Sequence, residues 1–236
     1  MEKLASRYGV QAKVKPRRIA YKETIRKSVS IRGRHKKQSG GHGQYGDVVV
    51  EIKPNPRGVG FTFTDTITGG VVPKGYIPAV EAGIREWMGR GILGFPVVDF
   101  TVNLSDGSYH DVDSSEMAFK MAARLAMTEG MPQCSPVLLE PILAVDIHVP
   151  SEATARVNQI ISGHRGQILG FDGREGWPGW DTVKAHMPEA EVASLIVEIR
   201  SATAGVGTFD MRFDHLSELT GRAADQVVEQ AKAEAA

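Results

Sequence analysis

The sequence predicts an α+β protein made of two consecutive units, and three observations lead to this fold class. Residues 96–104 alternate apolar and polar side chains, which is the period-2 pattern of a strand with one buried face. Residues 189–200 instead carry apolar side chains at helical spacing. Pro132 and Pro136 bracket a linker between two stretches that each mix both patterns. We therefore expect strands and helices on both sides of this linker.

The chain has 236 residues with 42% apolar composition, which is enough for two ordinary globular cores. We predict four segments: the end of a preceding domain at 1–15, a first unit at 16–135, a second unit at 136–216 and a helical tail at 217–236. A single cysteine excludes an intrachain disulfide, and no stretch has the length of a membrane span or the apolar core of a signal peptide. We expect a cytoplasmic monomer with no membrane partner.

The first unit is predicted to hold several strands and two helices. Its apolar patterns are extended over 18–31, 48–52, 61–67 and 96–104, and helical over 77–88 and 114–130. Pro78 suits the first turn of its helix. The last strand should stop at the turn residues Asp106 and Gly107.

The helix at 114–130 has a recognisable start. Asp113 with Glu116 three residues later predicts an N-cap and a capping box. Met117, Met121 and Leu125 follow at i, i+4 and i+8, so we predict that they form the buried face.

The second unit shows the order β-α-β-β-α-β. The predicted elements are strand 138–149, helix 153–162, strands 165–171 and 181–187, helix 189–200 and strand 207–213. This is the order of a ferredoxin-like unit, in which four antiparallel strands carry both helices on one face.

The net charge of zero hides a strong asymmetry. Residues 1–46 contain thirteen Lys/Arg and two Asp/Glu, a net charge of +11, and the remainder carries −11. Such a basic segment is the electrostatic footprint of a polyanion, most often nucleic acid. A solvated basic strand pair without a partner is the open alternative. The basic residues nearest the following turn are Arg32, Arg34, Lys36 and Lys37.

Residues 38–46 form a glycine-rich stretch that precedes a strand. A phosphate-binding loop of the Walker type needs a Gly-Lys pair, which the sequence lacks, and a dinucleotide fingerprint needs a strand before the glycines. Two interpretations stay open, a structural hairpin turn and a loop whose backbone lies against RNA.

A second polar loop lies between strand 96–104 and helix 114–130. It holds a donor-rich set of side chains on a solvent-facing turn: Ser108, Tyr109, His110 and Asp111. With Asp99, Asp106 and Asp113, these residues also suggest a metal-dependent hydrolase. However, no nucleophile and oriented base accompany them, and no Cys/His cluster has zinc spacing. We therefore predict no catalytic residue and no metal ligand.

Four motifs carry a resemblance to a known family. They are Gln38-Ser-Gly-Gly-His-Gly-Gln-Tyr-Gly46, Gly69-Gly-Val-Val-Pro73, Gly107-Ser-Tyr-His-Asp-Val-Asp-Ser-Ser-Glu-Met-Ala-Phe119 and Leu138-Leu-Glu-Pro-Ile142. In this order they resemble the C-terminal half of translation elongation factor G. By this resemblance, residues 1–15 are the end of its third domain, 16–135 its fourth and 136–216 its fifth.

The resemblance implies a ribosomal-protein-S5 domain-2-like fold for the fourth domain. Its tip would enter the small-subunit decoding site and promote tRNA–mRNA translocation, so the expected partners are the ribosome, its rRNA and the tRNA–mRNA duplex. By motif match, the tip residues are Gly43, Gln44, Tyr45, Ser108, Tyr109, His110 and Asp111, with Arg32, Arg34, Lys36 and Lys37 as the basic approach.

The resemblance places GTP and Mg²⁺ in an N-terminal domain outside this chain, so we expect no cofactor here and no GTPase activity from these residues alone. The sequence also departs from the family, because residues 171–180 form an unusual hairpin with Trp177 and Trp180. These tryptophans would either stack on RNA or staple the hairpin. A non-translocating elongation-factor-G-like paralogue and a stand-alone RNA-binding or ribosome-associated module remain the alternatives.

Overall fold

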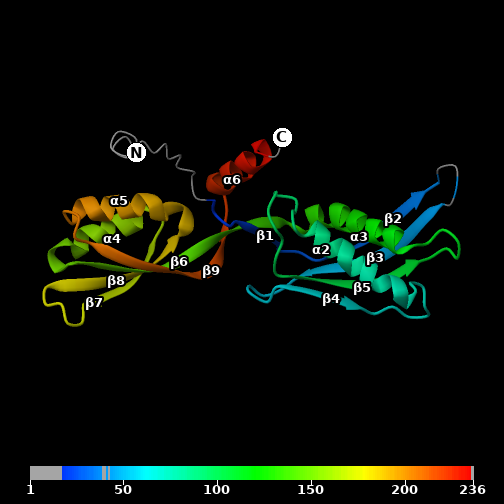
Figure 1. Ribbon diagram of the computed structural model, residues 1–236, viewed down its shortest axis with the longest axis horizontal. Coiled ribbons are helices and arrows are strands. Elements are labelled where there is room, and N and C mark those ends of the chain that lie inside the picture. The colour runs from blue at the N-terminus through cyan, green and yellow to red at the C-terminus, as the bar shows by residue number, and fades with distance from the viewer. Residues whose placement is uncertain (1–17, 39–40, 42, 235–236) are drawn as a thin grey trace, which may run out of the picture.

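The computed structural model describes residues 18–38, 41 and 43–234, which form two lobes side by side along the long axis of the molecule (Figure 1). Each lobe combines a sheet with helices, so the predicted α+β class is confirmed. The end of a preceding domain expected at residues 1–15 lies outside the described residues. No helix among the described residues is long and apolar enough to cross a membrane.

The first lobe is a four-stranded sheet covered on one face by two helices (Figure 1). The strands, in spatial order, are β2 (Val29–Lys37), β3 (Gln44–Pro54), β5 (Phe100–Ser108) and β4 (Phe61–Asp65). The helices are α2 (Ile77–Trp87) and α3 (Glu116–Gly130). Because β4 and β5 pair in parallel, the chain needs a crossover between them, and α2 provides it.

Helix α3 packs unusually close to the sheet, and two glycines make this possible. A Cβ atom built on Gly33 would lie 2.2 Å from the carbonyl oxygen of Ala122, and one on Gly46 would lie 2.4 Å from that of Ala118. The buried face of α3 is therefore rich in alanine.

The predicted face of α3 was wrong. Met117 is 59% exposed, and Met121 and Leu125 are only half-buried. The predicted N-cap was wrong as well: Ser115, not Asp113, caps the helix, since its hydroxyl oxygen accepts from the amide of Ala118 at 3.2 Å.

Strand β5 also differs from its prediction, because it does not stop at Asp106 and Gly107. Its register with β3 pairs Leu104 with Val50 but Asp106 with Val49, so one residue of β5 bulges out of the ladder. The strand then continues to Ser108. The bulge turns Ser108 toward the face of the sheet opposite the helices, next to Asp47.

The second lobe has the predicted β-α-β-β-α-β order. Its elements are β6 (Pro136–Pro150), α4 (Thr154–Gly163), β7 (Gln167–Gly173), β8 (Trp180–Pro188), α5 (Val192–Ala202) and β9 (Thr208–Leu219). The spatial order β9-β6-β8-β7 is fully antiparallel, and both helices lie on one face (Figure 1). Trp177 and Trp180 pack edge-to-face on the β7–β8 hairpin, with ring centroids 5.5 Å apart, which favours the staple over RNA stacking.

A waist of three strands joins the lobes. Strand β1 (Lys22–Ile25), which precedes the first lobe in sequence, pairs with the start of β6, and the end of β9 pairs with β6 from the other side. Glu218 on β9 forms ion pairs with Arg26 and Arg57. The helical tail predicted for 217–236 begins later than expected, because β9 continues to Leu219. The helix is α6 (Arg222–Ala233), which buries none of its residues fully and lies beside the waist (Figure 1).

Short 3-10 turns complete the path of the chain. They lie at Lys74–Tyr76, Met131–Cys134, Ser151–Ala153 and Glu189–Glu191.

Candidate nucleic-acid interface

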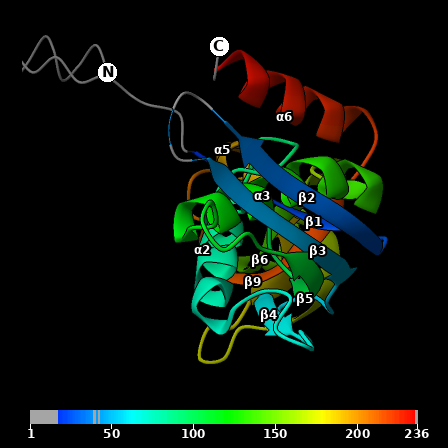
Figure 2. The same cartoon turned by 90° about the vertical axis from the view of Figure 1, so that its right-hand side faces the viewer.

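The two loops singled out in the sequence meet at the end of the first lobe that is far from the waist. The start of β3 and the β5–α3 loop lie together there, at the right of Figure 1, and Figure 2 views the molecule from this end. The Tyr45 hydroxyl and the Ser108 hydroxyl are 2.7 Å apart, so the two loops are in direct contact. We call this end of the lobe the tip, defined by residues 43–45 and 108–114.

Main-chain hydrogen bonds fix the two tip loops to one another. The amide of Tyr45 donates to the carbonyl of Asp113 at 2.8 Å, and the Ser114 hydroxyl donates to the carbonyl of Tyr45 at 2.9 Å. Ser114 also accepts from the amide of His110 at 2.9 Å. Each loop therefore holds the backbone of the other in place, and the side chains between them are presented from a fixed frame.

His110 is held by its own loop and faces outward. Its Nδ1 atom accepts from the amides of Val112 and Asp113 at 3.3 and 3.2 Å, as in the tautomer with the proton on Nε2, and lies 3.6 Å from a carboxylate oxygen of Asp113. The side chain is 57% exposed. No other described residue bonds Nε2, so its N–H can donate to a ligand outside the protein.

Gln44 lies at the start of β3, within the tip, and is also exposed. Its Oε1 atom accepts from His35 Nε2 at 2.8 Å, which orients the amide and leaves its NH₂ group as the outward donor. The ring of Tyr45 lies between the two loops, with its centroid 6.4 Å from that of His110. The tip thus offers two donors and an aromatic ring within one small area.

The tip glycine Gly43 lies close to the side chain of Asp113. A Cβ atom there would lie 2.7 Å from a carboxylate oxygen of Asp113. Gly46 instead lies against the backbone of α3, which cannot move aside as a side chain can. At these positions the glycines serve close packing of the protein against itself, in addition to any approach to a ligand.

Tyr109 and Asp111 complete the predicted set and project from the β5–α3 loop. Tyr109 is 46% exposed, and Asp111 is exposed as well. All seven predicted tip residues therefore gather at one end of the lobe.

The basic approach on β2 is partly neutralised by a residue that sequence reasoning missed. Asp47 is fully buried and accepts from Arg32 Nε at 3.0 Å and from Arg34 at 3.4 Å. The Ser108 hydroxyl donates to the same carboxylate at 2.6 Å. Asp47 thus ties the basic strand to the tip. The signal was present in the sequence, because Arg32 and Arg34 alternate with Gly33 and an acid follows at the start of the next strand.

Lys36 and Lys37 extend the basic surface toward the tip. Both are exposed, on the part of β2 that pairs with Gln44 and Tyr45. Together with the two arginines they place positive charge along one edge of the sheet. Phosphate oxygens are the ligands that such a row of cations attracts without regard to base sequence.

The carboxylates considered for a hydrolytic site do not gather in one place. Asp99 precedes β5, at the end of this strand opposite the tip, and is 3% exposed. It accepts from the amide of Gly60 at 2.8 Å and pairs with Arg57 at 3.1 Å. Asp111 and Asp113 lie beyond the other end of β5. The geometry therefore gives no support to a metal-dependent hydrolase at His110.

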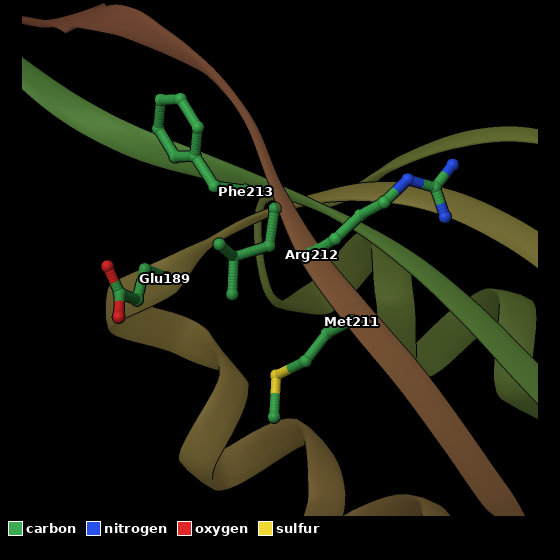
Figure 3. Close-up of a pocket in the computed structure, with 5 residues that line it drawn as sticks. Glu189, Met211, Arg212 and Phe213 are labelled. Atoms are coloured by element: carbon green, nitrogen blue, oxygen red, sulfur yellow. The ribbon is translucent and has the colours of Figure 1, made fainter.

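The second lobe carries a shallow pocket of about 210 Å³ beside β9. Figure 3 shows Met211 reaching toward the nearby helix and Arg212 extending to the other side of the strand. The residues that line the pocket are Leu143, Glu189, Met211, Arg212 and Phe213. This set contains no nucleophile with an adjacent base, so the pocket offers no catalytic chemistry.

Two protein families match this chain in consecutive segments. The family described as "Elongation factor G, domain IV" matches residues 17–135, and the family described as "Elongation factor G C-terminus" matches residues 137–227. The first match covers the lobe that carries the tip, and the second covers the other lobe with part of α6.

Two individual proteins show the same similarity. An "Elongation factor G-like protein" of Synechocystis sp. is 58% identical over 219 residues, which is 93% of this chain and 33% of the relative. A crystal structure from Thermus thermophilus superposes with a TM-score of 0.85 at 39% identity, over 96% of this chain and 34% of that one. The chain spans about a third of the length of these two proteins.

Proposed function

This chain belongs to the elongation factor G family, and on that premise we propose that it is the ribosome-facing part of such a factor. In this proposal the tip of the first lobe enters the decoding site of the small subunit. There it contacts the tRNA–mRNA duplex and its rRNA surroundings, and so promotes translocation.

The observation that carries the proposal is the outward Nε2–H of His110, on a tip whose two loops are hydrogen-bonded to each other. RNA without accessible base edges is recognised through phosphates, 2′-hydroxyls and stacking. The imidazole N–H and the Gln44 amide can donate to phosphate or sugar oxygens, and the Tyr109 ring can stack on a base. None of these contacts reads a base sequence, which suits a factor that must act on every codon.

The basic edge of the sheet has a separate role in the proposal. Lys36 and Lys37 attract the RNA backbone before the tip engages. The part of the charge of Arg32 and Arg34 that Asp47 does not compensate adds to this attraction. Binding should therefore weaken steeply with salt, whereas the tip contacts should contribute a part that depends less on salt.

The remaining functions of the factor belong, in this proposal, to a region outside these residues. That region would bind GTP and Mg²⁺, and the present lobes would transmit its state to the decoding site. The site of action is where ribosomes translate, in the cytoplasm, and the factor binds as a monomer.

The test is binding of this chain to vacant and tRNA-filled ribosomes over a salt series. We expect His110→Ala and Gln44→Ala each to weaken binding by roughly tenfold, the effect of losing one stacking or hydrogen-bonding contact to RNA. Gln133→Ala, an exposed glutamine far from the tip, is the matched control. Chemical probing of the rRNA should show protection in the decoding site. Wild-type affinity in both tip variants, or protection only elsewhere, would reject the role of the tip.

A second candidate is a paralogue that binds ribosomes without translocating. The name of the 58% identical relative, "Elongation factor G-like protein", favours it. The discriminating assay is single-turnover translocation with the full-length factor. Ribosome binding with no movement of the mRNA would support the paralogue.

A further inference from the structure

Three side chains with metal-binding atoms meet on the face of the second sheet that the helices leave open. His186 lies on β8, and Asp214 and His215 lie on β9. The two strands do not pair with each other, because β6 lies between them. His186 and His215 pair with Ala144 and Ile142 of β6. The ligand atoms of the three side chains nevertheless all lie within 4.8 Å of one another.

A break in the register of β9 explains how two consecutive residues reach the same place. In a regular strand, neighbours point to opposite faces of the sheet. Here Ile142 pairs with His215 and Leu143 pairs with Phe213, so Asp214 is the extra residue of a bulge. Asp214 and His215 consequently both lie within reach of His186.

The distances show an arrangement centred on the carboxylate. Asp214 Oδ2 lies 2.6 Å from His215 Nδ1 and 3.6 Å from His186 Nε2. The two imidazole rings meet edge-to-face, with centroids 5.4 Å apart. His186 is the most shielded of the three, and the other two are exposed.

We propose that His186, Asp214 and His215 form a binding site for a divalent transition-metal ion, of which Zn²⁺ fits the set best. Imidazole nitrogen and carboxylate oxygen are the ligands that zinc accepts at about 2.0 to 2.2 Å, whereas Mg²⁺ and Ca²⁺ prefer oxygen alone. Three protein ligands leave one position of a tetrahedral ion for water. An ion held there links β8 to β9 across β6.

The surroundings fit this coordination. A surface pocket of about 190 Å³ adjoins the two histidines and includes Ser217 and Gln167, which can hydrogen-bond a metal-bound water. The Arg165 guanidinium, also in this pocket, is already bidentate on Glu140 at 2.8 and 3.1 Å and pairs with Glu191. Its positive charge is therefore largely compensated and does not oppose a cation.

The electrostatics of Asp214 agree with a ligand role. The hydrogen bond from His215 lowers the pKa of the Asp214 carboxyl, and the nearby charges of His186, His215 and Arg212 lower it further.

The first experiment is equilibrium dialysis of the full chain against Zn²⁺ at neutral pH. We expect one tight site per chain, and a loss of affinity of more than about tenfold in His186→Gln, Asp214→Asn and His215→Gln. The matched control is His148→Gln, which removes another histidine on the open face of the same sheet, one that contacts Thr182 and Asp210. Mg²⁺ in excess should not displace the bound ion.

A second measurement needs no variant and therefore does not depend on their folding. On addition of Zn²⁺, the ring nitrogen signals of His186 and His215 should shift in NMR spectra of the wild-type chain, while those of His148 stay in place. The proposal is overturned if the wild-type chain binds no Zn²⁺. It is equally overturned if the ligand variants bind as tightly as the wild type, or if other histidines respond instead.

Discussion

Replacing Glu23 by glutamine should change how the stability of this protein depends on pH. Glu23 lies on β1 at the waist and is 1% exposed. Its Oε2 atom accepts from the amide of Leu93 at 2.8 Å, while Oε1 has no hydrogen-bond partner among the described residues. Burial in this environment disfavours the charged form and raises the pKa of Glu23 from 4.5 to about 7.

The sign and size of the effect follow from the two pKa values. Between pH 4.5 and about 7 the folded protein keeps a proton that the unfolded chain has released. The free energy of unfolding therefore falls as pH rises through this window. A shift of this size corresponds to a loss of roughly 3 kcal/mol once the pH exceeds both values. Glutamine cannot titrate, so Glu23→Gln lacks this loss.

The assay is urea-induced unfolding of both proteins, followed by far-UV circular dichroism at several pH values between about 5 and 8. We expect the stability of Glu23→Gln minus that of the wild type to rise by roughly 2.5 kcal/mol across this range, because a small part of the loss already occurs below pH 5. The difference cancels all other titrating groups. Glu129→Gln, the same change at an exposed glutamate, should give a constant difference. Parallel curves for Glu23→Gln and the wild type would refute the reasoning.

Three further predictions concern packing, reactivity and charge. Gly46→Ala should lower the free energy of unfolding by about 1 to 3 kcal/mol, because its Cβ would lie 2.4 Å from the Ala118 carbonyl oxygen. Gly75→Ala, with open space around it, should lower it far less. Equal urea midpoints for the two variants would contradict this. Cys134 is buried, and burial raises the pKa of its thiol to about 11. A thiol reagent should therefore modify Cys134 much faster in urea than in the native protein. Equal rates would show that the thiol is accessible in the folded state. Asp47→Asn should lower the free energy of unfolding by about 1 to 3 kcal/mol. It should also steepen the salt dependence of ribosome binding, because the paired arginines lose their counter-charge. An unchanged salt slope would argue that these arginines do not face RNA.

Element types and their order could be predicted from the sequence where one periodicity dominates. Helix α5 follows from Val192, Leu195 and Ile199, all of which are buried as the spacing requires. In β5, Phe100, Val102 and Leu104 are likewise buried. Such patterns depend only on which side of a helix or strand faces the core. They can therefore be recognised without knowing which element packs against that side.

The face of α3 could not be predicted in this way, because it is decided by residues in other strands. Size alone favours Met117 as a core residue. However, Gly33 and Gly46 bring the sheet so close that only small side chains fit between, and Ala118 and Ala122 are buried instead. The information lies in a contact between segments that are far apart in sequence.

The strand ends and the pairing at the waist escaped prediction for a related reason. The bulges in β5 and β9 break the period-2 pattern, so each strand was expected to stop where the alternation fails. The pairing of β1 with β6 joins distant segments and leaves no local signal.

At the candidate site, the motifs were sufficient to name the side chains of the tip but not the bonds that hold them. The placement of His110 and Gln44 at one end of the lobe agrees with the expectation. Asp47 was not predicted, because the alternating Arg32 and Arg34 indicate an ion pair with it only once the pairing of β2 with β3 is known. The tautomer of His110 depends on two amides of its own loop and can be assigned only from their geometry.

The three-stranded waist has a mechanical consequence. A single-chain connection between domains bends freely, whereas neighbouring hydrogen-bonded strands resist bending within their plane, because the bonds along one side would have to stretch. Here β6 runs from the waist through the whole second lobe, flanked by β1 and β9. A rotation of the second lobe is therefore transmitted through the waist to the first lobe, and the tip, being farthest from the waist, undergoes the largest displacement.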